Sequence, residues 1–185
     1  MLLRLFPLGL LVASGFATAA PMQKLSQNEC KPVGESLIRQ LPEAWIPYLA
    51  HTKACPLAKR GGKAAVTLVS IFTIEYYEKQ PDSAPWENFP RPLLLDRQGK
   101  CLGQLAELYP DEQPRELILH YGKWQGALPG LIQVQVKDPT PGGDYRLPDL
   151  NWNARQGKYL VADTIDPDLK EKMQCPMISK SQSAN

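Results

Sequence analysis

The sequence predicts an α+β domain, with a mostly antiparallel β-sheet of five or six strands, one or two short N-terminal helices, and disulfide bonds. Three observations lead to this prediction. Stretches rich in β-branched and aromatic residues recur from residue 64 onward, which is typical of strands. Turn residues rather than long helices separate them, so the βαβ alternation of a parallel sheet is absent. The chain also carries four cysteines, an even number, after a segment that resembles an export signal.

The first nineteen residues have the order of a secretory signal peptide. Arg4 supplies a positive charge, residues 5–16 are apolar, and small residues stand at 17–19. The apolar run is shorter than the roughly 20 residues that a membrane-spanning helix needs. We therefore expect cleavage before Ala20, with no cysteine there to take a lipid anchor.

The predicted organisation is a signal peptide over 1–19, one domain over 20–178 and a flexible C-terminal tail over 179–185. Residues 20–185 carry twenty Lys and Arg against nineteen Asp and Glu, a charge near +1. Nucleic-acid binding needs a concentrated basic face, so no nucleic-acid partner is expected. Lys59, Arg60 and Lys63 form a basic cluster that is interpreted as a solvated turn. After the signal, no apolar run is long enough to anchor the chain in a membrane.

The cysteines are expected to be oxidised, because disulfides are typical of exported proteins. Of the three connectivities that four cysteines allow, we favour Cys30–Cys55, which closes a local loop, and Cys101–Cys175, which holds the C-terminal segment against a strand. The chain has no N-x-Ser/Thr glycosylation site, which is compatible with a bacterial source. Together with the signal peptide, this indicates a periplasmic protein, with secretion as the alternative.

The N-terminal part predicts two short helices. Residues 34–41 have apolar side chains at helical spacing and end before Pro42. Residues 43–51 form a second helical segment that Pro47 could split. Residues 20–32 are expected to be extended, and residues around 55–62 to form loops. The strongest strand covers 64–77, because nearly all of its side chains are β-branched or aromatic.

Further strands follow at short intervals. Residues 93–95 and 101–105 flank a polar run that ends in Gly, which predicts a β-hairpin. Residues 116–121 and 131–137 alternate apolar and polar side chains, as half-buried strands do. A turn at 153–157 leads to a strand over 158–162, and a helix is expected over 166–174. The tetrapeptide Arg-Gln-Gly-Lys occurs at both 97–100 and 155–158, which indicates shared turn chemistry.

Motifs for catalysis or cofactor binding are missing. The sequence lacks G-x-S-x-G, a Walker loop, a dinucleotide fingerprint and H-E-x-x-H, so we expect no cofactor and no metal. His51 and His120 are the two histidines, and a small exported hydrolase that uses them, or a carboxylate, is the alternative function.

Aromatic residues in or beside loops indicate binding instead. Trp and Tyr are common binding anchors because they bury a large area at a low entropy cost. The candidate binding residues are Tyr121, Lys123, Trp124, Tyr145 and Trp152. For the two segments that hold them, 120–126 and 144–153, ordinary packing of the aromatic rings on the core is the alternative.

The expected function is therefore binding of another protein or a cell-envelope component in the periplasm. An inhibitor, an immunity protein and an envelope-assembly accessory all fit this expectation. An adaptor in a secretion or conjugation apparatus is a further alternative.

Overall fold

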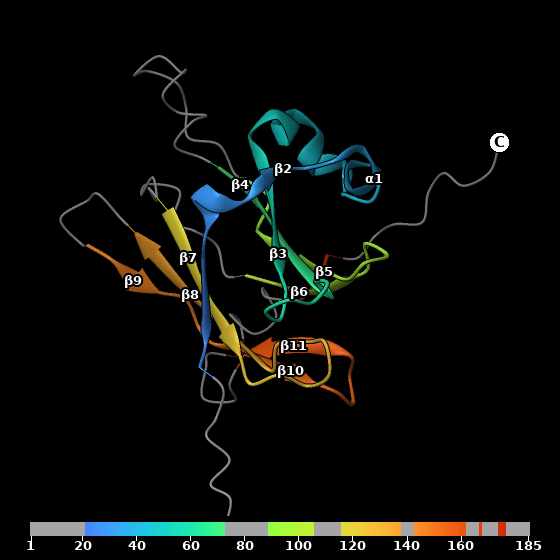
Figure 1. Cartoon of the computed structure of the whole chain (residues 1–185). Helices are drawn as coiled ribbons and strands as arrows, with labels where there is room; N and C mark the ends of the chain where they lie inside the picture. The colour runs from blue at the N-terminus through green and yellow to red at the C-terminus, as the bar shows by residue number, and fades with distance from the viewer. Residues whose placement is uncertain are drawn as a thin grey trace, which may run out of the picture.

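The computed structural model describes residues 21–72, 89–105, 116–137, 143–161, 167 and 174–176. The predicted signal peptide, the later part of the strand expected over 64–77, most of the helix expected over 166–174 and the predicted C-terminal tail lie outside these residues. In the described part, two antiparallel sheets and a few short helices build the fold (Figure 1). The predicted fold class, mostly antiparallel with few helices, is confirmed.

Sheet A has the strand order β1-β7-β8-β10-β11, and β9 pairs with β8 beside this path. Its strands are β1 (Gln23–Ser26), β7 (Glu116–Gly122), β8 (Leu131–Lys137), β9 (Tyr145–Arg146), β10 (Leu150–Asn153) and β11 (Lys158–Val161). Sheet B has the order β2-β3-β4-β5-β6. Its strands are β2 (Lys31–Pro32), β3 (Thr52–Leu57), β4 (Val66–Ile71), β5 (Leu93–Leu95) and β6 (Cys101–Gln104). The sequence predicted the strand type but not the division into two sheets.

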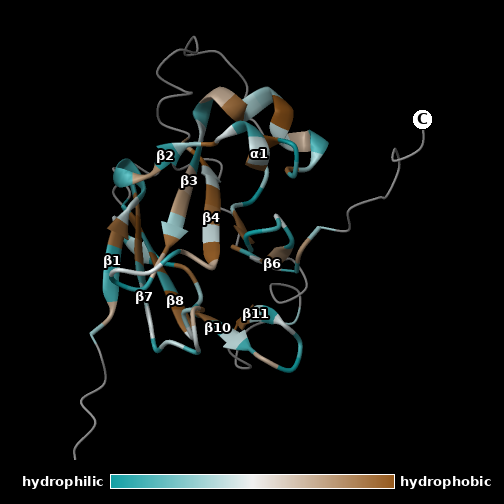
Figure 2. Ribbon diagram, turned by 45° about the vertical axis from the view of Figure 1, so that its right-hand side comes forward, coloured by the Kyte–Doolittle hydropathy of each residue, from teal (hydrophilic) through white to brown (hydrophobic). Residues whose placement is uncertain are grey.

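Sheet B is buried on both of its faces. One face packs on sheet A, where Leu68 of β4 shares a core with Leu119 and Ile132. On the other face, Val69 and Ile71 pack with Trp45 and related residues from the helical segments. These segments are α1 (Glu35–Ile38) and the 3-10 helix η2 (Glu43–His51), which match the two predicted helices. Figure 2 shows the consequence: β4 is largely brown, whereas the loops are mainly teal.

The strand β3 is an element that the sequence prediction missed, because Cys55-Pro56 was interpreted as part of a loop. Proline cannot donate a backbone hydrogen bond and normally avoids central strands. Here β2 pairs only with Lys53 and Ala54, so it ends before Pro56 and leaves that side of β3 without a neighbouring ladder. Pro56 therefore lies where no partner strand needs its N–H, opposite Thr67 of β4.

A short segment carries the chain from sheet A to sheet B. The 3-10 helix η1 (Gln27–Glu29) begins with a capping box, in which the Ser26 hydroxyl accepts from Asn28 N and Glu29 accepts from Ser26 N, each at 3.0 Å. The buried Gln27 amide donates to the Ser70 hydroxyl of β4 at 3.0 Å. These bonds fix the angle at which the chain crosses between the sheets.

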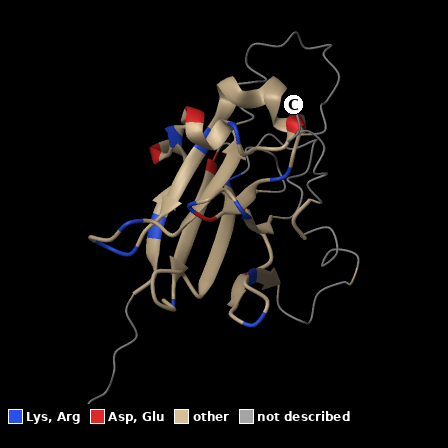
Figure 3. Cartoon of the chain, turned by 90° about the vertical axis from the view of Figure 1, so that its right-hand side faces the viewer, with Lys and Arg blue, Asp and Glu red and all other residues tan. Residues whose placement is uncertain are grey.

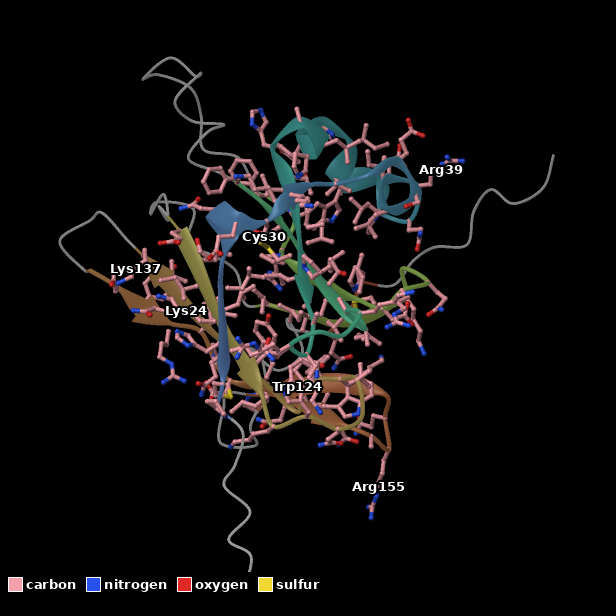
Figure 4. All side chains as sticks on the ribbon, viewed as in Figure 1. Lys24, Cys30, Arg39, Trp124, Lys137 and Arg155 are labelled. Atoms are coloured by element: carbon pink, nitrogen blue, oxygen red, sulfur yellow. A yellow bond between two sulfur atoms is a disulfide. The ribbon has the colours of Figure 1, made fainter. Side chains whose placement is uncertain are left out.

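Two disulfides complete the frame, with the connectivity that the sequence favoured. Cys30 bonds to Cys55 with 4.7 Å between their Cα atoms, directly after η1 (Figure 4). Cys101 of β6 bonds to Cys175, 74 residues later in the chain, with 5.9 Å between their Cα atoms. The first bridge joins β3 to the crossover, and the second ties the C-terminal segment to sheet B.

Candidate functional site

Two of the candidate aromatic residues form a contact at the end of β7. The ring of Tyr121 meets the indole of Trp124 edge to face, with 6.0 Å between ring centroids. Tyr121 is 5 % exposed and belongs to the core between the sheets, and Trp124 is half-buried against that core. Burial raises the pKa of the Tyr121 hydroxyl, and the Glu29 carboxylate raises this pKa further. Trp124 therefore packs against the edge of the core.

Trp152 has a similar position on the neighbouring hairpin. It lies in β10, not in a presented loop, because residues 150–153 pair with β11 and extend the sheet. Its ring packs on Tyr159 with 5.1 Å between centroids, and its backbone N–H donates to Gly130 O at 3.0 Å. The Tyr159 hydroxyl donates to the Pro129 carbonyl at 2.8 Å, and burial raises its pKa.

The structure separates Tyr145 from the other candidates. Tyr145 lies in β9 opposite Val136, whereas the β10 residue Asn151 lies opposite Leu131 at the start of β8. Five strand positions separate Val136 from Leu131, which corresponds to about 16 Å. Four of the five candidates, Tyr121, Lys123, Trp124 and Trp152, therefore share one end of sheet A, and Tyr145 does not.

A compact loop holds Lys123 and Trp124 between β7 and β8. Gly130 N donates to Lys123 O at 3.1 Å, and Gln125 and Leu128 exchange two backbone hydrogen bonds around a tight turn. Gly126 has φ +63° at the first central position of this turn, which favours glycine. A Cβ atom at Gly130 would lie 2.2 Å from Lys123 O, so only glycine allows the chain to close here. The loop presents the exposed Lys123 side chain outward.

Three other turns lie on the same side of the molecule. We call the four together the basic loop end: loops 58–65, 96–100 and 123–130, and the turn 154–158, whose last residue begins β11. Within each sheet, strand direction places two of these turns at the same end: β3 and β5 run in the same direction in sheet B, and β7 and β10 do so in sheet A. In Figure 1 the β7–β8 and β10–β11 turns lie at the bottom of the molecule and η2 lies at the top.

Specific hydrogen bonds join these turns across the two sheets. The Arg97 side chain donates from Nε to Ala64 O at 2.8 Å and from Nη2 to Lys63 O at 3.2 Å, which ties loop 96–100 to loop 58–65. With its amide oriented to satisfy both neighbours, Gln23 donates to Ala58 O at 2.8 Å and accepts from Arg60 N at 3.0 Å. Gln23 pairs with Tyr121, so loop 58–65 lies beside the end of β7.

The charge at the basic loop end is strongly one-sided. Its cations are exposed without exception and come from all four turns: Lys59, Arg60, Lys63, Arg97, Lys100, Lys123, Arg155 and Lys158. Against these eight stands one carboxylate, Asp96, whose Oδ1 already accepts from the N–H groups of Gln98 (2.8 Å) and Lys100 (2.9 Å). In Figure 3 the lower loops carry blue segments, whereas the upper end carries blue and red segments together.

The two Arg-Gln-Gly-Lys turns have related backbone bonds. In the first, Asp96 Oδ1 accepts from Gln98 N and Asp96 O accepts from Gly99 N at 3.1 Å. In the second, Asn153 supplies the equivalent side-chain oxygen to Gln156 N at 3.0 Å and its carbonyl to Gly157 N at 2.9 Å. Both glycines have positive φ, +77° and +61°. The turn geometry needs the Asp or Asn and the Gly, but not the Arg and Lys.

Sequence reasoning missed this charge segregation because it considered the net charge. The described residues carry fifteen Lys and Arg against seven Asp and Glu. At the ends of the strands opposite the basic loop end, the chain enters segments 73–88, 106–115 and 138–142, whose sequences together hold eight acidic and two basic residues. The acidic surplus of these segments in the sequence offsets the basic surplus of the described residues, so the net charge of the whole chain is close to zero.

The structure does not bring the two histidines together. His120 lies in β7 between Lys24 and Gln133, on the face of sheet A that points away from sheet B. His51 ends η2, beside sheet B. Sheet A therefore stands between His120 and the rest of the fold, including His51. In the described part of the chain, no group of three or more His, Cys, Asp or Glu residues could hold a metal ion.

Among the described residues, none of the helices has the length and apolar character needed to cross a bilayer. Comparisons of the chain with protein-family models, with curated proteins and with solved structures found no match.

Proposed function

We propose that the protein is an exported, non-catalytic binding protein, and that the basic loop end is its binding surface for an acidic partner in the cell envelope. The observation that carries this proposal is the convergence of eight exposed cations from four separate turns, with one carboxylate that backbone N–H groups already engage. Apart from Arg97, which ties two of the turns together, the turns do not require these side chains, so their shared location is best explained by a partner of opposite charge.

Two observations support export of the protein from the cytosol, which is part of the proposal. Residues 1–19 have the pattern of a signal peptide, and the disulfides are of the kind that persists in oxidising compartments such as the periplasm. The four candidate residues that share one end of sheet A border the basic loop end, and Lys123 belongs to its charged set. The binding region therefore overlaps the one that the sequence predicted, but we assign most of the binding free energy to the cations and not to an indole anchor.

The hydrolase alternative has weaker support. Acid–base catalysis by two histidines requires both to reach one substrate within hydrogen-bond distance. His51 and His120 lie on opposite sides of sheet A, so one bound substrate would not reach both.

Two matched variants test the proposal. The basic-end variant changes one lysine in each turn to glutamine: Lys59→Gln, Lys100→Gln, Lys123→Gln and Lys158→Gln. The control variant removes four cations elsewhere: Lys24→Gln, Lys31→Gln, Arg39→Gln and Lys137→Gln. Figure 4 shows Lys24, Arg39 and Lys137 on parts of the surface away from the β10–β11 turn, which carries Arg155. Arg39 and Lys137 pair with Glu35 and Asp144 in exposed ion pairs, which contribute little to stability.

The measurement is the dissociation constant of each purified protein for isolated bacterial envelope fragments at low ionic strength. We expect the basic-end variant to bind at least about tenfold more weakly than wild type and the control variant to bind like wild type, since long-range attraction depends on where the charge lies. Equal binding by the two variants would reject the basic loop end as the binding surface.

A further inference from the structure

The surface chemistry of the basic loop end narrows the class of partner, on the premise that the proposed function holds. Protein–protein interfaces have a core that is rich in aromatic residues and poor in lysine. The exposed cations of the basic loop end include five lysines, which such interface cores disfavour, beside three arginines. The one large hydrophobic side chain that is strongly exposed in the described chain, Ile46 at 62 %, lies on η2.

The spatial distribution of the cations favours a ligand that carries many separate negative charges over a single small anion. A single bound phosphate needs several donors that converge on one point. Here the cations come from turns in both sheets, and Arg97 bonds to the carbonyls of loop 58–65, which holds that guanidinium along the surface. Arg155 extends away from the body of the protein (Figure 4) and makes no hydrogen bond or ion pair within the described residues. A broad array of this kind matches many separate negative charges.

Half-buried indoles border the array. Trp124 packs on the core edge beside Lys123, and Trp152 packs on Tyr159 in the next hairpin. Tryptophan and lysine together are typical of protein surfaces at a lipid headgroup layer, where the indole meets the interface and the ammonium meets the anionic groups.

We propose that the basic loop end docks the protein on an anionic lipid surface, with the four turns facing the headgroups. The opposite end of the molecule, which carries η2, then points away from the membrane (Figure 1). Docking of this kind is peripheral and reversible, because it depends on charge and not on an inserted segment.

The test is co-sedimentation with vesicles of pure phosphatidylcholine, and with vesicles in which phosphatidylglycerol replaces part of it. Wild-type protein should bind the anionic vesicles and not the neutral ones, and added salt should reverse the binding. The basic-end variant, which loses four cations from this surface, should have a partition coefficient roughly 600-fold lower than wild type, because each cation contributes about fivefold. The control variant defined above should partition like wild type. Urea midpoints of both variants close to the wild-type value show that the folds are intact.

Two results would overturn the inference. One is equal binding to neutral and anionic vesicles, and the other is equal binding of the two variants to anionic vesicles. Envelope fragments treated with protease separate this failure from failure of the proposed function. If the protein ignores lipid vesicles and loses its envelope binding after the protease treatment, the partner is an acidic protein, and the lipid inference is wrong while the proposed function stands.

Discussion

The hydroxyl of Tyr159 in β11 donates a 2.8 Å hydrogen bond to the carbonyl of Pro129, which precedes β8. This bond joins the last described strand to the loop that carries Trp124. The backbone bond from Trp152 to Gly130 lies beside it, so two hydrogen bonds fix the β10–β11 hairpin against the β7–β8 loop. The basic loop end depends on this junction, because it determines how the cations of one turn lie relative to those of the other.

Replacement of Tyr159 by Phe should therefore destabilise the fold without removing the ring. Tyr159 and Pro129 are both buried, so the Pro129 carbonyl would lose its partner, at a cost of about 1–2 kcal/mol in the free energy of unfolding. Urea denaturation measures this loss. An unchanged urea midpoint would show that the bond does not stabilise the junction.

Tyr159 should also make the stability of the wild-type protein depend on pH in the alkaline range. The folded-state pKa of Tyr159 is raised by burial above the ordinary value of 10.0. The stabilising contribution is therefore complete below about pH 10 and is lost as the pH rises toward the folded pKa, by about 1.4 kcal/mol per pH unit. Urea midpoints across this range should fall less steeply for Tyr159→Phe than for wild type. Parallel slopes would contradict this assignment.

Trp124→Ala should affect stability more than binding. The indole is half-buried on the core and contacts Tyr121 edge to face, so its removal should cost about 2–3 kcal/mol of unfolding free energy. Binding to envelope fragments should weaken less than in the basic-end variant. The opposite pattern, with a binding loss of about 2 kcal/mol and an unchanged urea midpoint, would make Trp124 the anchor that the sequence suggested.

Peptide mapping should identify the two disulfide bonds, and reduction should reveal their contribution to the free energy of unfolding. Peptide mapping without reduction should give Cys30–Cys55 and Cys101–Cys175, the bridges of the structure. Loop-entropy estimates give about 3.5 kcal/mol for the first bridge and about 4.5 kcal/mol for the second as upper values. Reduction should therefore lower the urea midpoint strongly. A mapped Cys30–Cys175 peptide would contradict the fold at the crossover between the sheets.

The exported form should begin at Ala20. Small residues at 17 and 19 match the requirement of a signal peptidase, so intact-mass measurement of protein from the periplasmic fraction should show loss of residues 1–19. Retention of those residues in all fractions would remove the support for export, while the fold and the charge distribution would be unaffected.

Much of the fold was predictable because its signals are local. The alternation in β7 and β8, the Gly-containing turns and the even number of cysteines all depend on residues close in the sequence. The division into two sheets was not predictable in this way, because strand β3 contains Pro56 and the crossover depends on contacts such as Gln27 with Ser70. Pairing over long sequence distances leaves no periodic pattern.

The candidate site was predictable only in part for the same reason. Lys123 and its neighbours were found because aromatic residues mark that segment. The other cations lie in three turns that are far apart in the sequence, and each alone has the composition of an ordinary solvated turn. Long-range contacts bring them together: the pairing of Gln23 with Tyr121, the bonds of Arg97 to loop 58–65 and the bond of Tyr159 to Pro129. The repeated Arg-Gln-Gly-Lys was the one local hint, and it was interpreted as turn chemistry alone.

The most direct test of the account is site-specific photo-cross-linking in intact cells, which identifies the end of the molecule that faces the partner. Ala127 and Ala154 are exposed at the tips of two turns of the basic loop end, and Ala50 is exposed on η2 at the opposite end. With a photoreactive residue placed at each position in turn, we predict cross-links to an envelope component from positions 127 and 154 and none from position 50. Cross-links from position 50 with none from the two turns would contradict the assignment of the basic loop end as the binding surface.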